Sequence, residues 1–254
     1  MFQLLLVIIY LSFISLGLPD SLLGSAWPAI YPQLNVPVSY AGIISMVIAG
    51  GTIISSLQSD RLTRLLGTGK VTAISVTMTA LALFGFSISD SFIELCLWAI
   101  PYGLGAGSVD AALNNYVALH YESRHMNWLH CMWGVGASVG PYIMGYVMTR
   151  GGTWNGGYRC IAFLQVVLTV IIIFSLPLWK ERPSITDESG KEVAARELSL
   201  KEVFKISGVK EILLCFFCYC ALEQTAGLWA SSYLTLYKGV PAETAAKYAS
   251  LFFI

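Results

Sequence analysis

Charged residues are scarce in this chain of 254 residues, since Asp, Glu, Lys and Arg make up 12% of it and apolar residues 56%. The mean hydropathy of +0.68 is too high for an ordinary soluble domain of this length. Lysine and arginine are absent from the first three residues, so the apolar start lacks the basic segment of a secretory signal peptide. The composition predicts a polytopic membrane protein, and its net charge of zero gives no reason to expect a nucleic-acid partner.

The chain also lacks the residue sets of enzymes and metal centres. Cys215, Cys218 and Cys220 lie close together, but no neighbouring histidine completes a zinc site, and packing is the simpler interpretation. The GTGK ending at Lys70 is not a phosphate loop, because Arg64 stands where that motif requires glycine. No pairing of a nucleophile with a base is evident. We therefore expect no enzyme activity, no metal and no cofactor.

Long apolar runs, by contrast, recur along the whole sequence. About 20 apolar residues cross a bilayer as a helix. An eighth run begins near Ala242 and is too short to cross when it reaches Ile254, so we expect the chain to end within a helix. The seven complete spans are predicted at residues 3–27, 39–59, 70–89, 92–119, 127–149, 157–179 and 211–237.

Basic residues are distributed unevenly between the loops. With a cytoplasmic N-terminus, 11 of the 15 lysines and arginines lie inside, as the positive-inside rule requires. The polar segment 180–210 is then cytoplasmic, with one amphipathic stretch expected at the membrane interface (Leu198, Leu200, Val203 and Phe204). This layout predicts a six-helix transmembrane bundle at residues 1–179, a cytoplasmic linker at 180–210 and the start of a second bundle at 211–254. We expect a multi-pass protein of the cell membrane.

Three carboxylates interrupt the apolar spans. A charged residue at the centre of a membrane helix costs about 2.5–3.5 kcal/mol, so each needs a partner, a proton or a wet cavity. Asp20, in GLPDSLLGSAWP, follows a proline expected to break the first span. Asp110 and Asn114 lie four apart and share a helix face. Glu223, beside Gln224, is a candidate from the second bundle, and all five residues are predicted to serve binding or coupling rather than structure alone.

The start of the fifth span carries hydroxyl-binding and aromatic groups on one side. Asn127, His130 and Gly134 recur at helical spacing, with Trp133 beside them. Amides and imidazole bind hydroxyl groups, and a tryptophan face covers apolar C–H surface, which favours a sugar. The alternatives are a packing histidine and a tryptophan of the interfacial belt.

Two further motifs complete a family pattern. SLQSDRLTRLLGTGK, in the predicted loop after the second span, resembles the loop motif of the major facilitator superfamily, with Asp60 and Arg61 in place and both of its glycines replaced. GVGASVGPYIMG resembles the glycine-proline motif of that superfamily's fifth span, in which small residues allow close helix packing and proline bends the helix. Its residues here are Gly136, Gly140, Pro141 and Gly145.

Together, PDSLLGSAWP, GLGAGSVDAALNNYV and MNWLHCMWGVGASVGP resemble the sugar-transporting, fucose permease-like branch of this superfamily. The resemblance implies an all-α membrane protein with a complete N-terminal six-helix bundle and the first part of the C-terminal bundle. It also implies that Asp20 and Asp110 correspond to carboxylates that serve sugar binding and proton coupling, and that Asn127 corresponds to a binding amide. Asp110 is shorter than the glutamate of that family.

These observations favour a secondary transporter that takes up a sugar or similar small polar solute with protons, with Asp110 carrying the proton and Asp20 binding substrate hydroxyls or sharing in coupling. Its partners would be the solute, protons and the lipid bilayer, and transport would need the missing C-terminal half. Two alternatives stay open. One is a proton-driven exporter of amphipathic compounds, which the glycine-proline motif also fits. The other is a non-transporting membrane sensor or assembly partner.

Overall fold

The computed structural model describes residues 2–179 and 200–253, and these ranges contain helices and turns but no strand. The predicted amphipathic stretch is only partly covered, since Leu198 lies outside the described residues. The helices are α1 (Phe2–Gly17), α2 (Leu22–Gln33), α3 (Tyr40–Leu66), α4 (Thr68–Ile88), α5 (Phe92–His120), α6 (Ser123–Thr149), α7 (Trp154–Ser175), α8 (Leu200–Val203), α9 (Val209–Leu236) and α10 (Ala242–Ser250).

A helix lies at each of the seven predicted spans. Among the residues that the structure describes, six spans are long and apolar enough to cross a membrane, with α1 and α2 together forming the first. The prediction of seven differs at α6, which has 27 residues but is not among these six. After His130 it contains four glycines, Pro141 and two tyrosines, which keep its hydropathy low. The chain is an integral membrane protein with several spans.

The turns that delimit the helices follow from local chemistry. Gly67, with a φ of 82°, ends α3 in a conformation that favours glycine, and its N–H donates to the Thr63 carbonyl oxygen at 2.8 Å. Ser91 caps α5 by accepting from the Glu94 N–H at 3.3 Å. Thr153 caps α7 in the same way through Gly156. Each cap satisfies a backbone group that would otherwise lie unpaired near the membrane.

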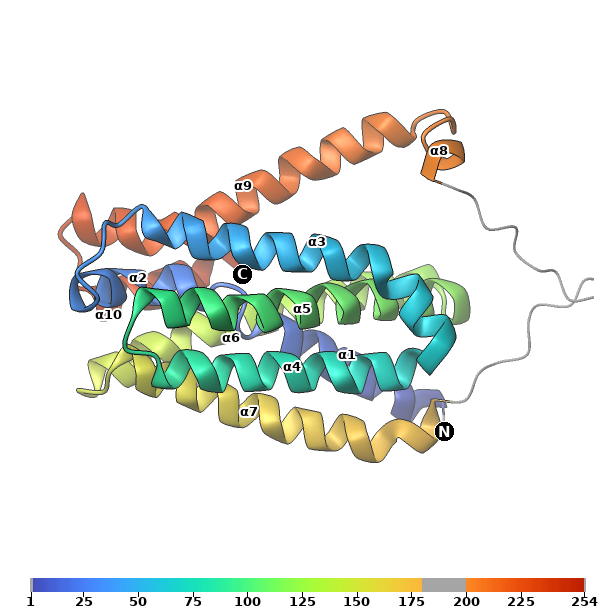
Figure 1. Cartoon of the computed structure of the whole chain (residues 1–254), viewed down its shortest axis with the longest axis horizontal. Coiled ribbons are helices and arrows are strands. Elements are labelled where there is room, and N and C mark those ends of the chain that lie inside the picture. The colour runs from blue at the N-terminus through green and yellow to red at the C-terminus, as the bar shows by residue number, and fades with distance from the viewer. Residues whose placement is uncertain (1, 180–199, 254) are drawn as a thin grey trace, which may run out of the picture. The chain divides into compact units, whose positions relative to one another are not determined.

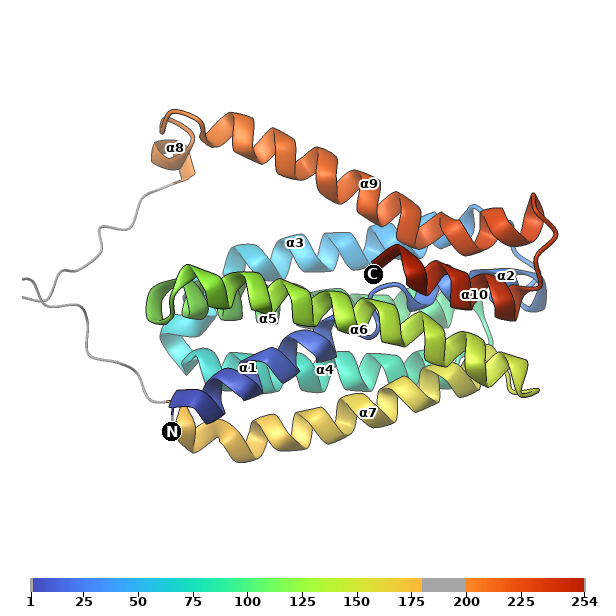
Figure 2. The same ribbon diagram turned by 180° about the vertical axis from the view of Figure 1, so that it is seen from behind.

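The chain divides into two compact units, residues 1–179 with 227–254, and residues 180–226. The boundary at residue 227 falls inside α9, so the last turns of α9 and all of α10 belong with the first unit. In that unit α3, α5, α4 and α7 lie side by side in this order (Figure 1), and α3 and α4 both pack on α5. The first span packs on α6 through α1, and α10 packs on the other end of α6 (Figure 2).

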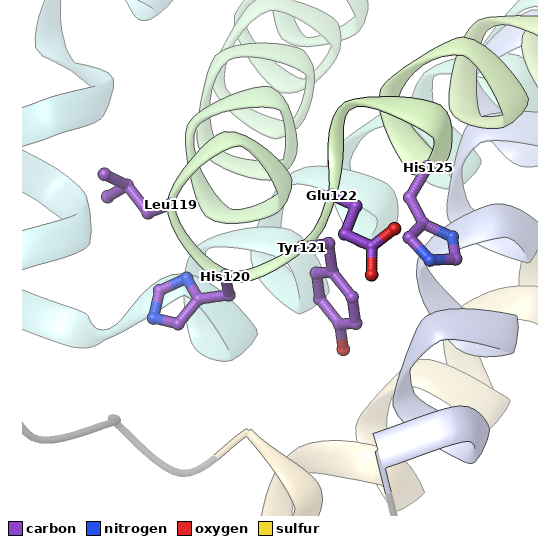
Figure 3. Close-up of a pocket in the computed structure, with 5 residues that line it drawn as sticks. All are labelled: Leu119, His120, Tyr121, Glu122 and His125. Atoms are coloured by element: carbon purple, nitrogen blue, oxygen red, sulfur yellow. The ribbon is translucent and has the colours of Figure 1, made fainter.

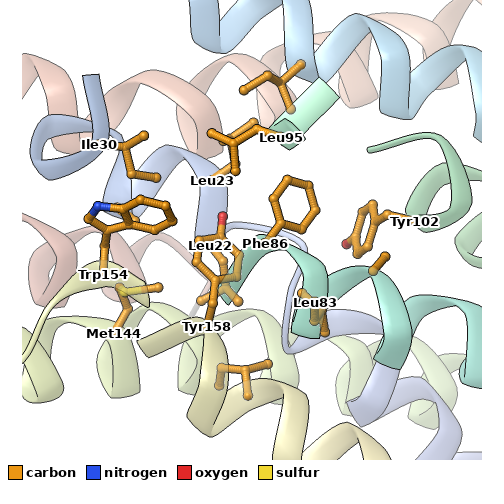
Figure 4. Packing of buried hydrophobic residues seen from close by; sticks show 14 of the residues in the cluster. Leu22, Leu23, Ile30, Leu83, Phe86, Leu95, Tyr102, Met144, Trp154 and Tyr158 are labelled. Carbon is orange, nitrogen blue, oxygen red and sulfur yellow. The ribbon is translucent and has the colours of Figure 1, made fainter. Parts of the chain in front are cut away.

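The apolar core of the first unit lies in two clusters along the bundle. One joins α2, α4, α5 and α7, and Figure 4 shows part of it, with Trp154 and Tyr158 of α7 packed near Leu22 of α2 and Phe86 of α4. Phe86 and Tyr158 stack with ring centroids 5.3 Å apart. The other cluster joins α1, α4, α5 and α6 nearer the N-terminus. These clusters fix the first span, α5 and α6 relative to one another, and those three elements carry the polar side chains described next.

Candidate functional site

Asp20 lies where the first span is broken. α1 ends at Gly17 and α2 begins at Leu22, and the turn between them contains Pro19, which has no N–H to continue a helix. The Asp20 N–H donates to the Gly17 carbonyl oxygen at 3.1 Å. Its side chain is exposed, and its Oδ2 accepts a hydrogen bond from Trp133 Nε1 of α6 at 3.2 Å. The helix break therefore presents a carboxylate toward α6.

A tyrosine that the sequence did not single out adds to this environment. Tyr102 of α5 is 5% exposed and lies within electrostatic range of Asp20. It follows Pro101 in the same apolar helix. The spacing along α5 gives no sign of this approach, because it depends on how α5 is rotated against the first span.

The second carboxylate, Asp110, lies on α5 and is partly buried. Asn114 Nδ2 donates to Asp110 Oδ1 and to the Asp110 carbonyl oxygen, both at 3.0 Å. This is the pair that the four-residue spacing predicts. His130 of α6 lies close enough to Asp110 for the two to interact electrostatically. Asp110 and Asn114 therefore form a hydrogen-bonded pair on α5, within electrostatic range of His130 on α6.

One face of α6 relates the two carboxylates. His130, within electrostatic range of Asp110, and Trp133, which donates to Asp20, are three residues apart and so project from the same side of the helix. The Phe13 ring of α1 lies 5.9 Å from the His130 ring. Asn127, one turn before His130, is exposed, and no hydrogen bond of its side chain is found in the described part of the chain. Sequence spacing predicted the α6 residues but not which carboxylate each one meets.

Glycines let α6 approach the broken span closely. A Cβ on Gly136 would overlap the Ile14 carbonyl oxygen, and one on Gly140 would overlap the Leu18 carbonyl oxygen. On the first span, a Cβ added to Gly17 would likewise overlap the Trp133 carbonyl oxygen of α6. These approaches place backbone against backbone beside the break, where a larger residue at any of the three positions would force the helices apart.

The rest of this motif lies farther along α6. Pro141 is buried within the helix, which continues through it without a break. A Cβ on Gly145 would stand 2.7 Å from the Glu243 carbonyl oxygen and 3.0 Å from the Lys247 nitrogen, so this glycine lies against α10. The motif thus contacts both the first span and the segment after α9.

The expected loop position of Asp60 and Arg61 is wrong. Both lie within α3, which continues to Leu66 because no residue before Gly67 interrupts it. Asp60 Oδ2 pairs with Arg64 one turn later, at 2.9 Å, and both side chains are largely exposed. An exposed pair of this kind is worth about 0.3–0.5 kcal/mol, so its contribution to helix stability is small.

Glu223 and Gln224 lie on α9 in the second unit. Glu223 Oε1 accepts from Tyr219 Oη at 3.1 Å, and Gln224 is exposed. The described part of the chain has no group of three His, Cys, Asp or Glu side chains placed to bind a metal.

Near the turn between α5 and α6 a cavity of about 380 Å³ opens to the surface (Figure 3). Its two histidines have no role predicted from the sequence, and each forms a hydrogen bond. His125 Nδ1 lies 2.8 Å from Tyr10 Oη, and His120 Nδ1 lies 2.8 Å from the Tyr116 carbonyl oxygen. The remaining lining residues are Leu119, Tyr121 and Glu122.

Comparison with known proteins places these features in a family. The family model for the Major Facilitator Superfamily matches residues 9–254. The chain is 26% identical over 164 residues to a cis,cis-muconate transport protein of Acinetobacter baylyi, covering 61% of this chain and 38% of that protein. It is 19% identical over 204 residues to the multidrug resistance protein fnx1 of Schizosaccharomyces pombe, covering 79% of this chain and 37% of that protein.

A solved structure shares the fold. The crystal structure of a D-xylose-proton symporter superposes with a TM-score of 0.70 over 98% of this chain and 65% of that one, at 13% sequence identity. With the two sequence relatives, by contrast, the match spans less than half of the relative's own length.

Proposed function

This chain belongs to the Major Facilitator Superfamily, and we propose that it takes part in the proton-coupled uptake of a small polyhydroxylated solute such as a sugar. The observation that carries the proposal is the pair of carboxylates in the first unit, one hydrogen-bonded to Trp133 of α6 and the other hydrogen-bonded to Asn114 of α5. Ionisable side chains in membrane spans are costly and mark substrate or proton pathways. Two of them on neighbouring helices provide one group for the proton and one for the solute.

The charges around these carboxylates favour a neutral solute. Asp20 and Asp110 are both acidic, and His130 is the basic side chain that interacts with Asp110. The two acidic side chains would repel a dicarboxylate. Sugar hydroxyls, by contrast, donate hydrogen bonds to carboxylates, and they both donate to and accept from amides. The relative that transports muconate therefore supports small-solute transport by this family without supporting the same substrate here.

In this proposal the residues have distinct roles. Asp20 accepts hydrogen bonds from solute hydroxyls, and Trp133 orients its carboxylate and offers a ring face to the sugar. Asn114, Asn127 and His130 add polar contacts, and Asp110 carries the proton. We also propose Glu223 and Gln224, on α9, as substrate-binding residues of the second bundle.

Transport by alternating access needs two bundles that move about a central site. We propose that residues 1–179 form the first bundle, 180–210 a linker and 211–254 the start of the second. Residues 1–254 alone, reconstituted in liposomes, should then accumulate no sugar against a gradient. Accumulation by that fragment would contradict the two-bundle mechanism.

We propose a cytoplasmic N-terminus in the cell membrane, from the distribution of basic residues. Ser123, the exposed first residue of α6, would then face the cytoplasm, and the exposed Asp90 between α4 and α5 would face outside. On a background without reactive native cysteines, Asp90→Cys should react with an impermeant maleimide in intact cells, and Ser123→Cys only after lysis. The reverse pattern would invert the orientation.

The decisive test of function uses the full-length transporter in proteoliposomes. Labelled sugars, muconate and a lipophilic dye are compared in counterflow, and sugars should exchange best. Asp110→Asn cannot bind and release a proton, so it should abolish accumulation driven by a pH gradient while equilibrium exchange continues. Asp20→Asn should weaken both activities, because an amide accepts weaker hydrogen bonds than a carboxylate. Sugar accumulation by Asp110→Asn would refute its role in coupling, and intact exchange with lost accumulation in Asp20→Asn would reverse the two roles.

Export of amphipathic compounds is the second candidate. It is favoured by the fnx1 relative and by Gly136, Gly140, Pro141 and Gly145 on α6. Outward movement of the dye, inhibited by collapse of the pH gradient and unaffected by sugars, would replace the uptake proposal with this one.

A further inference from the structure

Phe253, to which the sequence assigned no role, contacts the candidate site from a segment distant in sequence. It belongs to the short 3₁₀ helix Leu251–Phe253, which follows α10 and packs on α6 (Figure 2). Its ring lies against the Trp133 indole of α6, with ring centroids 5.8 Å apart and planes at 84°, an edge-to-face arrangement. Trp133 is also the donor to Asp20 Oδ2. Phe253, Trp133 and Asp20 therefore form a continuous series of contacts.

The backbone around Phe253 leaves room for this side chain. A Cβ on Gly227 of α9 would stand 3.5 Å from Phe253 Cζ, and one on Gly134 of α6 would stand 3.7 Å from the Phe253 carbonyl oxygen. Each of the two helices thus presents a residue without a side chain where it meets Phe253. α10 itself packs tightly on α6, where Gly145 lies against Glu243. The segment that carries Phe253 is therefore held against α6 on both sides of α10.

The hydrogen bond between Trp133 and Asp20 depends on how the indole is held. At 3.2 Å from Nε1 to Oδ2, it is at the long end of the range of about 2.7–3.2 Å for N–H donors. Asp20 is exposed and Trp133 is half-buried, so water competes for both partners. An edge-to-face ring contact favours one orientation over others by about two- to tenfold. Phe253 supplies that contact to the indole.

We propose that Phe253 is a positioning residue of the solute site, whose ring holds the Trp133 indole in the orientation that donates to Asp20. This proposal deepens the proposed function and rests on it for its role in transport. Phe253 lies in residues 211–254, the proposed start of the second bundle, whereas Trp133 and Asp20 lie in the first. Movement of the second bundle away from α6 would remove the ring from Trp133, loosen the hydrogen bond and lower the affinity of the site. The contact thus makes solute affinity depend on the position of the second bundle.

Indole NMR tests the positioning role without any solute. The full-length transporter, with ¹⁵N-labelled tryptophan in lipid nanodiscs, gives a Trp133 signal that is identified by its loss in Trp133→Phe. Asp20→Asn shows how far this signal moves when the charged acceptor is lost. In Phe253→Leu the signal should move by about a third of that distance or more, and the Trp133 N–H should exchange with water about threefold faster or more, because the indole is no longer held in one orientation.

Two controls keep this result specific. Phe253→Tyr retains an aromatic ring and should leave the Trp133 signal close to wild type. Phe252→Leu makes the same change in the neighbouring exposed side chain, whose ring centroid lies 5.0 Å from that of Phe253, and should have little effect. The Trp154 signal, fixed by its bond to Gln33 at 2.7 Å, reports whether each variant is folded. An unchanged Trp133 signal in folded Phe253→Leu, or an equal change in Phe252→Leu, would overturn the positioning role.

Solute binding then separates positioning from direct contact. Equilibrium binding of labelled sugar to Phe253→Leu should weaken by about two- to tenfold, whereas Phe253→Tyr should keep wild-type affinity. Because Phe253 acts through the Trp133 Nε1 bond, adding Phe253→Leu to Trp133→Phe should weaken binding by less than about twofold more. A full further loss in the double variant would make Phe253 a direct solute contact and overturn the proposal. Since the NMR result does not depend on the solute, failure of every sugar to bind contradicts the proposed function and not the role of Phe253.

Discussion

The first unit contains two closely packed helix interfaces, one between α3 and α5 and one between the first span and α6. Glycines allow the close approach in both, but the two interfaces differ in what they do with polar groups. Between α3 and α5 the helices are unbroken, and α3 hydroxyls donate across the interface to α5 carbonyl oxygens, Thr52 to Gly103 at 3.3 Å, Ser56 to Gly107 at 3.1 Å and Ser59 to Ser108 at 3.2 Å. Between the first span and α6 the partner helix is broken, and the break carries Asp20. One interface satisfies its polar groups internally, whereas the other leaves a carboxylate exposed.

The difference indicates how the bundle separates support from chemistry. Interhelical hydroxyl bonds fix α5, which carries Asp110, against α3 without adding a charge. The α6 glycines serve the other interface, where they let α6 pack directly on the broken first span. The turn can therefore lie within the membrane, because protein covers its backbone. We expect substitutions at the first-span interface to affect both folding and transport, and those at the α3–α5 interface to affect stability alone.

The largest effect is expected at Gly140. Gly140→Ala would place a methyl group onto the Leu18 carbonyl oxygen, and overpacking of this kind costs about 1–3 kcal/mol. Gly134→Ala is the matched control on the same helix, because the nearest atom to its Cβ is the Phe253 carbonyl oxygen at 3.7 Å. Thermal unfolding of the purified protein in detergent should show a lower midpoint for Gly140→Ala only. Equal midpoints would mean that the close approach to the break adds nothing to stability.

An intermediate effect is expected at Trp133. Trp133→Phe removes the Nε1 donor to Asp20 and retains a ring opposite Phe253, whose centroid lies 5.8 Å away. Hydrogen bonds to charged groups are worth about 1.5–3 kcal/mol, so sugar affinity in the full-length transporter should weaken about tenfold or more. Trp128→Phe, on the exposed side of α6, should leave affinity unchanged. Equilibrium binding of labelled sugar measures the affinity of both variants. Equal losses would mean that the hydrogen bond to Asp20 is not the cause and that replacing any tryptophan of α6 weakens binding.

The smallest effect is expected in the α3–α5 interface. Ser56→Ala removes one interhelical hydroxyl bond, and such bonds average about 0.6 kcal/mol in membrane proteins. The unfolding midpoint should fall slightly while accumulation and exchange stay at wild-type levels. A loss of transport out of proportion to this change would show that the α3–α5 interface participates in coupling and would remove the contrast drawn above.

The sequence predicted local geometry more reliably than relations between helices. The break after Gly17 follows from Pro19, and the Asp110–Asn114 bond from a four-residue spacing, because both depend on neighbours along the chain. The approach of His130 to Asp110 depends on the rotation of α6 against α5, which spacing within either helix does not determine. Tyr102 was missed for the same reason.

The error at Asp60 and Arg61 has a different cause. The two charges predict a loop on composition alone, but charged residues readily extend a helix where it emerges into water, and Arg64 pairs with Asp60 across one turn. Apolar content locates the part of a helix within the membrane, and the backbone signal at Gly67 locates its end.

The helices of the bundle also differ in length, which bears on the membrane that suits them. At 1.5 Å per residue, α4 with 21 residues is about 32 Å long, whereas α3 with 27 and α5 with 29 are about 40 Å and 44 Å. A hydrocarbon core is about 30 Å thick. α3 and α5 are long enough to span a thicker bilayer if they tilt less from the membrane normal. α4, which packs on both α5 and α7, is only about as long as the hydrocarbon core is thick and cannot adapt in this way. The thickness of membrane that this bundle matches is therefore set by α4, its shortest unbroken span.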